Sequence, residues 1–288
     1  MTQARESATS LVVGAGGMIG RALADRLDRE GWPVLRTTRA PRPDAVTLDL
    51  AQDASAWAPP CEVDVGYLCA AVVSLDQCRK DPAGTFAVNV TGTVSLARTL
   101  LRRGAHVVFT STNLVFDGSS PQPRFDAPVA PATEYGRQKA EAERQLMALS
   151  DRVCIVRLSK VLGPGTPLLA RWAEDLRRGR VIHPFADMPV APVSLDFAVE
   201  VLLRVGQRRS SGIVQVSGTE EVTYEAVARR IADRLGVSQG LIVPIPAAAS
   251  GLNLEHIPRH AALDVTRLLD ELGMTPPDVW STIDGGFA

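Results

Sequence analysis

The sequence of 288 residues lacks an excess of charge of either sign, since 31 basic residues stand against 32 acidic ones and the formal net charge is −1. A protein that binds nucleic acid carries an excess of lysine and arginine, so we expect no nucleic-acid partner. There is also no apolar run as long as a membrane span, and the first ten residues, MTQARESATS, lack the apolar core of a signal peptide. These absences predict a cytoplasmic protein with no membrane partner.

Cysteine is scarce too, and its placement argues against a metal site. Cys61, Cys69, Cys78 and Cys154 form no CxxC pair, and no histidine stands at the spacing of metal ligands. We therefore expect reduced thiols and no bound metal.

Short apolar runs alternate with segments of helical periodicity through the first half of the chain. The expected strands span residues 11–13, 33–36, 46–48, 65–70, 106–109 and 153–158. Helices are expected at 19–27, 86–101 and 134–149. This alternation predicts an α/β fold, namely a Rossmann-type doubly wound parallel sheet covered by helices on both faces.

The alternation loosens after about residue 163, where prolines cluster. Further helices are expected at 168–178, 194–205, 224–235 and 264–272, and further strands at 212–216 and 241–245. We interpret residues 1–163 as a dinucleotide-binding Rossmann domain with return segments near 194–217. Residues 164–288 are interpreted mainly as a smaller C-terminal substrate-binding lobe, interleaved with the first domain.

A glycine-rich turn follows the first expected strand. Gly14, Gly17 and Gly20 have GxxGxxG spacing between that strand and a helix. The first glycine allows a tight turn, the second lets the backbone approach a pyrophosphate, and the third lets the helix pack on the strand. The helix N-terminus adds unpaired N–H groups and a positive dipole end. The turn therefore predicts a dinucleotide-binding site.

The end of the second expected strand indicates which nicotinamide dinucleotide binds. A site specific for NAD has an acidic residue there, which binds the adenine-ribose 2′-hydroxyl, but no acidic residue follows before Asp44. Arg39, with Arg36 and the Thr38 hydroxyl, suits a 2′-phosphate instead, because a guanidinium binds that group well. The sequence therefore favours NADPH over NADH.

Tyr135 and Lys139 stand four residues apart in EYGRQKAEAERQL, a segment of good helix formers, so both side chains lie on one face of a helix. A lysine ammonium beside a phenol lowers the pKa of the phenol from about 10 and makes it a proton donor or acceptor for a carbonyl/alcohol pair. Ser111 and Thr112 end the fifth expected strand, at the sheet edge where ligands of such folds bind. A hydroxyl there can bond the same carbonyl oxygen.

Several longer segments resemble one known family. They are GAGGMIG in the glycine-rich turn, TSTNLVFDG (110–118), YGRQK, IVRLSKVLGPG (155–165) and PRHAALDVTRLLDELG (258–273). With these segments the chain resembles an extended short-chain dehydrogenase/reductase, and it is most similar to the dTDP-4-dehydrorhamnose reductase family. The resemblance spans nearly the whole chain, and TSTNLVFDG followed by YxxxK is its specific part.

The resemblance implies roles for individual residues. Thr112, Tyr135 and Lys139 are implied to be the catalytic trio, with Lys139 also binding the nicotinamide ribose. Asn89, in FAVNVTGT, is implied to brace the site, although a hydrogen bond inside a helix is an alternative. The residues implied to contact the cofactor are Gly17, Met18 and Ile19 at the pyrophosphate, Asp49 and Leu50 at the adenine, and Ala70, Ala71, Val72 and Thr110 elsewhere.

Three positions depart from the family pattern. Asn113 replaces the Asp that follows the catalytic Thr, Cys69 replaces an Asn after the fourth strand, and Lys160 replaces an aromatic residue after the sixth. Lys160 is a cation where the resemblance places the sugar. The residues expected to contact the substrate are Ser111, Thr112, Asn113, Tyr135 and Lys160. The departures leave the residues for reduction intact and bear on which sugar is bound.

These features together predict an NADPH-dependent reductase of the keto group of a nucleotide-activated deoxysugar, with a homodimer as one option for its assembly. Two alternatives stay open, an epimerase or dehydratase of nucleotide sugars on the same scaffold and a non-catalytic NADP-binding regulatory subunit. Asn113 argues against dehydration, and the catalytic trio argues against the subunit. The candidate arginines for the substrate pyrophosphate are Arg171, Arg178, Arg180 and Arg259.

Overall fold

The structure is a computed structural model that describes residues 8–52, 54 and 57–287. Residues 1–7, which make up most of the N-terminal segment that lacks the apolar core of a signal peptide, lie outside this range. No helix in the described part of the chain is both long and apolar enough to cross a membrane.

One sheet organises the first half of the chain. Its strands are β1 (Ser10–Val13), β2 (Val34–Thr38), β3 (Val46–Thr47), β4 (Val65–Leu68), β5 (His106–Thr112), β6 (Val153–Leu158) and β10 (Gly212–Val216). They lie in the order β3-β2-β1-β4-β5-β6-β10. β1 pairs in parallel with β2 and β4, β2 with β3, and β4 with β5. This order reverses between β1 and β4, as in a Rossmann sheet, and confirms the predicted fold class.

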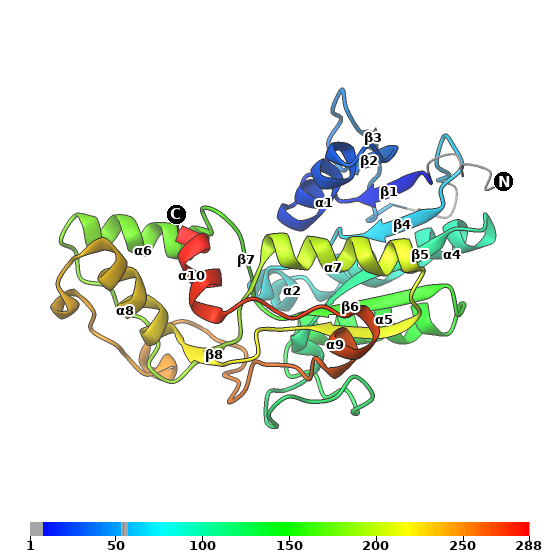
Figure 1. Cartoon of the computed structure of the whole chain (residues 1–288). Helices are drawn as coiled ribbons and strands as arrows, with labels where there is room; N and C mark the ends of the chain where they lie inside the picture. The colour runs from blue at the N-terminus through cyan, green and yellow to red at the C-terminus, as the bar shows by residue number, and fades with distance from the viewer. Residues whose placement is uncertain (1–7, 53, 55–56, 288) are drawn as a thin grey trace. The chain divides into compact units, whose positions relative to one another are not determined.

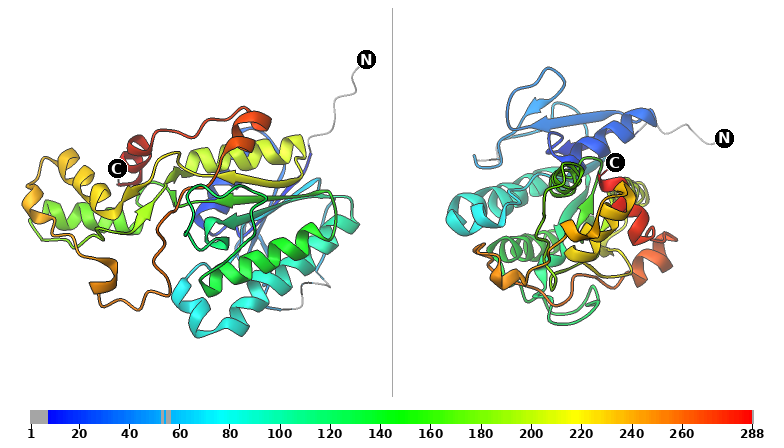
Figure 2. Two further views of the ribbon diagram at one scale, coloured as in Figure 1. Left: turned by 90° about the horizontal axis from the view of Figure 1, so that it is seen from below. Right: turned by 90° about the vertical axis from the view of Figure 1, so that its left-hand side faces the viewer.

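Helices cover both faces of this sheet (Figure 1, Figure 2). α1 (Met18–Arg29) and α7 (Leu195–Arg208) lie on one face, where Arg26 and Glu200 form an ion pair of 3.1 Å. α4 (Thr93–Arg102) and α5 (Glu134–Met147) lie on the other face. Because both faces are covered, every residue of β1, β4, β5 and β6 is buried.

The segment predicted as one helix over residues 86–101 is broken into pieces. It begins with α3 (Pro82–Phe86), continues as the π-helix Ala87–Gly92, and only then becomes α4. The hydroxyl of Thr93 donates to the Val88 carbonyl at 2.9 Å, across the widened turn. A short helix, α2 (Leu75–Lys80), precedes α3 and escaped prediction because six residues are too few to show helical periodicity. The π-helix carries Asn89 and thereby joins the candidate site.

The chain divides into two compact units. The first contains Met1–Val115, Thr133–Arg157 and Val199–Val214, and the second contains Phe116–Ala132, Leu158–Ala198 and Gln215–Ala288. Compared with the predicted boundaries, the loop 116–132 belongs to the second unit, which begins again at Leu158. The core of the first unit includes Leu11, Leu68, Leu100, Phe109 and Ile155.

The second unit has a core of its own, built by α6 (Pro167–Arg177), α8 (Tyr224–Leu235) and α10 (Val279–Phe287). Trp172 and Tyr224 meet there edge to face, with ring centroids 6.2 Å apart. α10 was not predicted, because its two adjacent glycines have low helix propensity. Smaller elements of this unit are β7 (Val161–Leu162), β8 (Pro189–Val190), β9 (Val193–Ser194), β11 (Val222–Thr223) and α9 (Thr266–Leu272).

The strand predicted at 241–245 is wrong. This segment begins in a 3-10 turn, Gln239–Leu241, and then makes only two isolated bridges, from Ile242 to Ile182 and from Ile245 to Phe185. Its apolar residues gave it the composition of a strand, but no neighbouring strand continues the pairing. Short apolar runs of this kind do not distinguish a strand from an extended loop.

Candidate active site

The glycine-rich turn lies where the sheet reverses its order. Gly14 has φ +85°, and a Cβ atom there would lie 2.8 Å from the Ala70 backbone, so only glycine fits between β1 and β4. A Cβ atom on Gly20 would overlap the Gly14 carbonyl, so α1 packs directly on the turn. Gly17 is the N-cap of α1, and no side chain caps the helix. The turn is thus a cradle of open backbone with the shape and polarity for an anionic group.

The end of β2 lies beside this turn. The amide of Ala15 donates to the Thr37 carbonyl at 3.0 Å, and Thr38 packs near Gly16. Arg39 follows, exposed to solvent and without an ion pair to any described residue. Its guanidinium is therefore available for a phosphate.

Arg36 does not share this role, and its predicted part in a phosphate site is wrong. Its guanidinium forms ion pairs with Asp28 and, at 3.3 Å, with Asp25 on α1. Hydrogen bonding to Asp28 raises the pKa of Arg36. The Thr38 hydroxyl likewise has a partner, since it donates to the Ala40 carbonyl at 2.7 Å.

The other residues implied to contact a cofactor lie at the ends of neighbouring strands. Ala70, Ala71 and Val72 follow β4 and are half-buried. Asp49 accepts from the Ala51 amide at 3.0 Å and is also half-buried. Leu50 instead belongs to the hydrophobic core, which leaves its backbone rather than its side chain to border an adenine.

The end of β5 and the first turns of α5 bring the catalytic candidates together. Lys139 donates to the Thr110 carbonyl at 2.6 Å, two residues before Thr112. Tyr135 precedes Lys139 by one turn, and both are buried, with exposed fractions of 8% and 2%. The Thr112 hydroxyl accepts from the Leu114 amide at 3.2 Å and reaches the Asn113 amide oxygen at 3.4 Å. That last contact is long, so a substrate oxygen could replace it.

The predicted effect of Lys139 on Tyr135 is wrong. Burial is the main cause that raises the pKa of Tyr135, and Lys139 is not among the causes. Burial also lowers the pKa of Lys139 to about 8, and the charge of Glu143 opposes this shift. The pair at neutral pH is therefore a neutral phenol and an ammonium, which suits a proton donor rather than a base.

Ser111 has a different partner from the one expected. Its hydroxyl donates to Glu143 on α5, and Glu143 in turn forms a buried ion pair of 2.8 Å with Arg157 on β6. Ser111 is therefore poorly placed to donate to a substrate. The sequence reasoning missed Glu143 and Arg157, although a charged residue inside the apolar run of β6 was a usable signal, since such residues are rarely buried unpaired.

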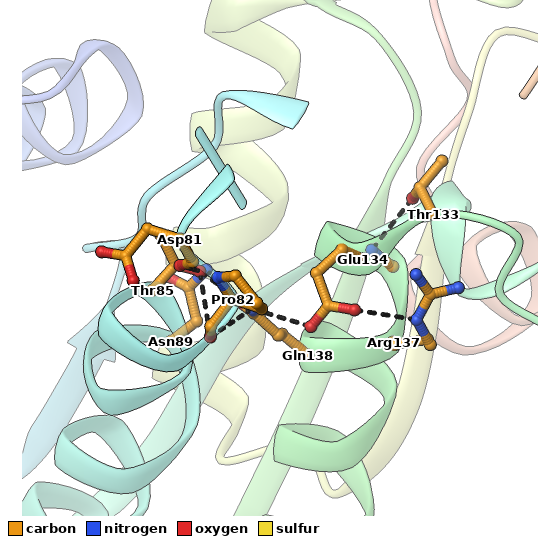
Figure 3. A network of polar contacts seen from close by, with 9 residues as sticks. Asp81, Pro82, Thr85, Asn89, Thr133, Glu134, Arg137 and Gln138 are labelled. Carbon is orange, nitrogen blue, oxygen red and sulfur yellow. Dashed lines mark hydrogen bonds and ion pairs between the residues drawn. The ribbon is translucent and has the colours of Figure 1, made fainter. Parts of the chain in front are cut away.

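Asn89 braces the segment after β4 through both the oxygen and the nitrogen of its side-chain amide. Its oxygen accepts from the Val72 amide at 2.8 Å, while its nitrogen donates to the Val72 carbonyl at 3.0 Å and to Gln138 at 2.8 Å. Gln138 also donates to Thr85 at 2.9 Å and to the Pro82 carbonyl at 3.2 Å (Figure 3). This network joins α5 to the segment expected to line the cofactor.

The family model of the RmlD substrate binding domain matches residues 8–284. The chain belongs to this family. It is similar to dTDP-4-dehydrorhamnose reductase of Streptomyces griseus, at 30% identity over 89% of this chain and 86% of the relative. It is also similar to dTDP-4-dehydrorhamnose reductase of Aggregatibacter actinomycetemcomitans, at 28% identity over 93% and 94% of the two chains. The family that the sequence resembles is thus confirmed.

The solved structure of dTDP-4-dehydrorhamnose reductase from Bacillus anthracis strain Ames, in complex with NADP, has the same fold. It superposes with a TM-score of 0.88 at 20% sequence identity, over 98% of this chain and 99% of that one. Because the superposition covers nearly all of this chain, both of its compact units have a counterpart in that structure.

The structure shows the surroundings of Cys69 and Lys160, two of the three residues that depart from the family pattern. Cys69 follows β4 and is half-buried, and burial raises the pKa of its thiol to about 12. Lys160 follows β6 in the second unit. Although its side chain is exposed, desolvation of its ammonium lowers its pKa.

The structure separates the arginines proposed for the substrate pyrophosphate. Arg178 pairs with Glu174 at 2.6 Å and Arg180 pairs with Asp175 at 2.5 Å, so carboxylates of α6 already neutralise both. The guanidinium of Arg259 donates to the Ser119 carbonyl at 3.4 Å, and the backbone amide of Arg259 donates to the Gly118 carbonyl at 3.1 Å. Arg171 on α6 and Arg259 are the better candidates, because neither guanidinium forms an ion pair with a carboxylate among the described residues.

We predict that Asn89→Leu frees the segment after β4. The substitution leaves the Val72 amide and carbonyl without their side-chain partner, at a cost of about 1 kcal/mol or more. Hydrogen exchange of the Val72 amide should therefore become at least about fivefold faster. Arg137→Ala, on the exposed side of α5, is the control and should leave that rate unchanged. An unchanged rate in Asn89→Leu would show that Asn89 does not brace the segment.

Proposed function

We propose that this protein is an NADPH-dependent reductase of the keto group in a nucleotide-activated deoxysugar, with dTDP-4-dehydrorhamnose as the first substrate to test. One observation carries the proposal. A chain of the RmlD family places Tyr135 and Lys139 on one face of α5, with the Lys139 ammonium bonded 2.6 Å from the carbonyl at the end of β5. The relatives named above supply the class of substrate.

The residues around the glycine-rich turn fit a phosphorylated dinucleotide. Gly14, Gly17 and Gly20 would hold the pyrophosphate, because the turn that they form presents backbone without side chains at the N-terminus of α1, which no side chain caps. Arg39 would hold the 2′-phosphate, since it has no described carboxylate partner. We propose NADPH as the cofactor on this ground, together with the NADP complex of the Bacillus anthracis protein.

When bound, the nicotinamide supplies the hydride that reduces the carbonyl carbon. The protein then has to deliver a proton and stabilise the oxygen. Tyr135 donates the proton, because its raised pKa keeps the phenol neutral at physiological pH. Thr112 donates a hydrogen bond to the same oxygen by giving up its long contact to Asn113. Lys139 adds positive charge near the developing oxyanion.

The alternatives that the sequence left open are not favoured. The named relatives are reductases rather than epimerases or dehydratases. A regulatory subunit has no use for a buried phenol and ammonium at the end of β5. The second unit as a substrate-binding lobe, a homodimer and a cytoplasmic location remain predictions.

We predict that the protein binds NADPH more tightly than NADH and that Arg39→Ala narrows the difference. A charge-assisted hydrogen bond contributes about 1.5–3 kcal/mol, so the ratio of the two dissociation constants should fall by about tenfold or more. Arg36→Ala is the matched control, because Asp25 and Asp28 already engage that guanidinium. Equal dissociation constants in the unmutated protein, measured by calorimetry, would refute the assignment.

We predict that Tyr135→Phe lowers kcat with dTDP-4-dehydrorhamnose by about 10²–10⁴-fold, because general acid catalysis contributes about that much. NADPH affinity should survive. Tyr224→Phe, which removes a hydroxyl from the second unit, is the control. In the unmutated protein, kcat should fall as the pH rises through about 8, since Lys139 then loses its charge. Equal turnover by Tyr135→Phe would end the catalytic assignment.

A further inference from the structure

A carboxylate and a guanidinium are buried beneath the catalytic candidates. Glu143 and Arg157 have exposed fractions of 4% and 2%. The guanidinium binds both carboxylate oxygens, with Nη2 at 2.8 Å and Nε at 3.1 Å. Glu143 also accepts from the hydroxyl of Ser111. One side chain of α5 thereby holds β5 and β6.

Stability alone does not explain this pair. Removing two charges from water costs free energy that their attraction often fails to recover, and apolar side chains can fill such a place without loss. Glu143 stands one turn after Lys139 on α5, so the two side chains are neighbours on one face. The position of the carboxylate points to Lys139 as the group on which it acts.

Several groups surround the Lys139 ammonium. The Thr110 carbonyl accepts from it at 2.6 Å, and the Phe109 ring lies 4.0 Å away. Tyr135 precedes it on α5, and the Cys69 thiol follows β4. Glu143 follows Lys139 on α5 and is the carboxylate that acts on its charge. Glu143 opposes the desolvation that otherwise favours the neutral amine.

We propose that Glu143 is a positioning residue of the active site, which holds Ser111 and Arg157 at neighbouring strand ends and keeps Lys139 an ammonium through its charge. Only one part of this proposal rests on the proposed function, namely the role of the Lys139 ammonium in the reduction. The protonation of Lys139 itself is a property of the chain. It can therefore be tested without substrate or cofactor.

The composition of the chain makes the test direct. The sequence contains only three lysines, Lys80, Lys139 and Lys160. Protein labelled with ε-¹³C-lysine should give three signals that titrate with pH, and the signal lost in Lys139→Arg is that of Lys139. Lys80 is exposed to solvent and provides a second lysine signal in the same sample. We expect the pKa of Lys139 near 8 in the unmutated chain.

Glu143→Gln removes the charge and keeps the acceptor for Ser111. We expect the pKa of Lys139 to fall by about 1, because a nearby opposite charge shifts a pKa by about that much or more. The alkaline limb of kcat should move to lower pH by the same amount. The double variant Glu143→Gln/Arg157→Met should show a smaller fall, because it also removes the positive charge of Arg157, and it avoids an unpaired buried guanidinium that could prevent folding.

A matched control lies on the same helix. Glu141 is paired with Arg144 on the exposed side of α5, so Glu141→Gln should leave the titration of Lys139 unchanged. If Glu143 had only a structural role, its replacement would shift the pKa of Lys139 in the opposite direction. Loosening the helix would admit water and move the pKa of Lys139 up, toward the ordinary value of a solvated lysine. A rise, or no change, in both Glu143 variants would overturn the proposal. Failure of the unmutated chain to reduce any sugar nucleotide would overturn the proposed function instead.

Discussion

The buried ammonium of Lys139 is the constraint on which the arrangement of the site depends. An ammonium without water needs a hydrogen-bond acceptor and a compensating charge, and both come from fixed elements: the Thr110 carbonyl on β5 and the Glu143 carboxylate on α5. These contacts fix α5 against the sheet edge. Tyr135, one turn earlier on the same helix, is placed by the same contacts, and its burial keeps it a phenol.

The glycine-rich turn and the segment after β4 are held by backbone packing and hydrogen bonds rather than by charge. Gly14 has to pass against Ala70, and the segment after Ala70 is held at Val72 by Asn89. Asn89 is in turn held by Gln138, the residue directly before Lys139. The segment implied to line a cofactor and the helix that carries the catalytic candidates are therefore connected through one buried amide pair. A substitution that displaces the segment after β4 should therefore also displace α5, and the reverse should hold.

The sequence predicted the parts of the fold that depend on local pattern. The order of strands and helices, the glycine-rich turn and the YxxxK spacing each follow from a periodicity or a spacing. The corrections concern contacts between distant residues. Arg36 was predicted to be a phosphate ligand, but its guanidinium forms ion pairs with Asp25 and Asp28 of α1. Ser111 resembled a substrate donor, but its partner, Glu143, lies 32 positions later on another element. Such pairings depend on tertiary packing.

The most direct test of the proposed reaction follows the hydride itself. NADPH carrying deuterium at C4 of the nicotinamide, given separately as each of its two epimers with dTDP-4-dehydrorhamnose, should label the product with one of the two. We expect one deuterium on the carbon that bore the keto oxygen for each NADPH oxidised, as seen by mass spectrometry and NMR. An isomerised sugar without label and without net oxidation of NADPH would contradict a reductase and indicate an epimerase.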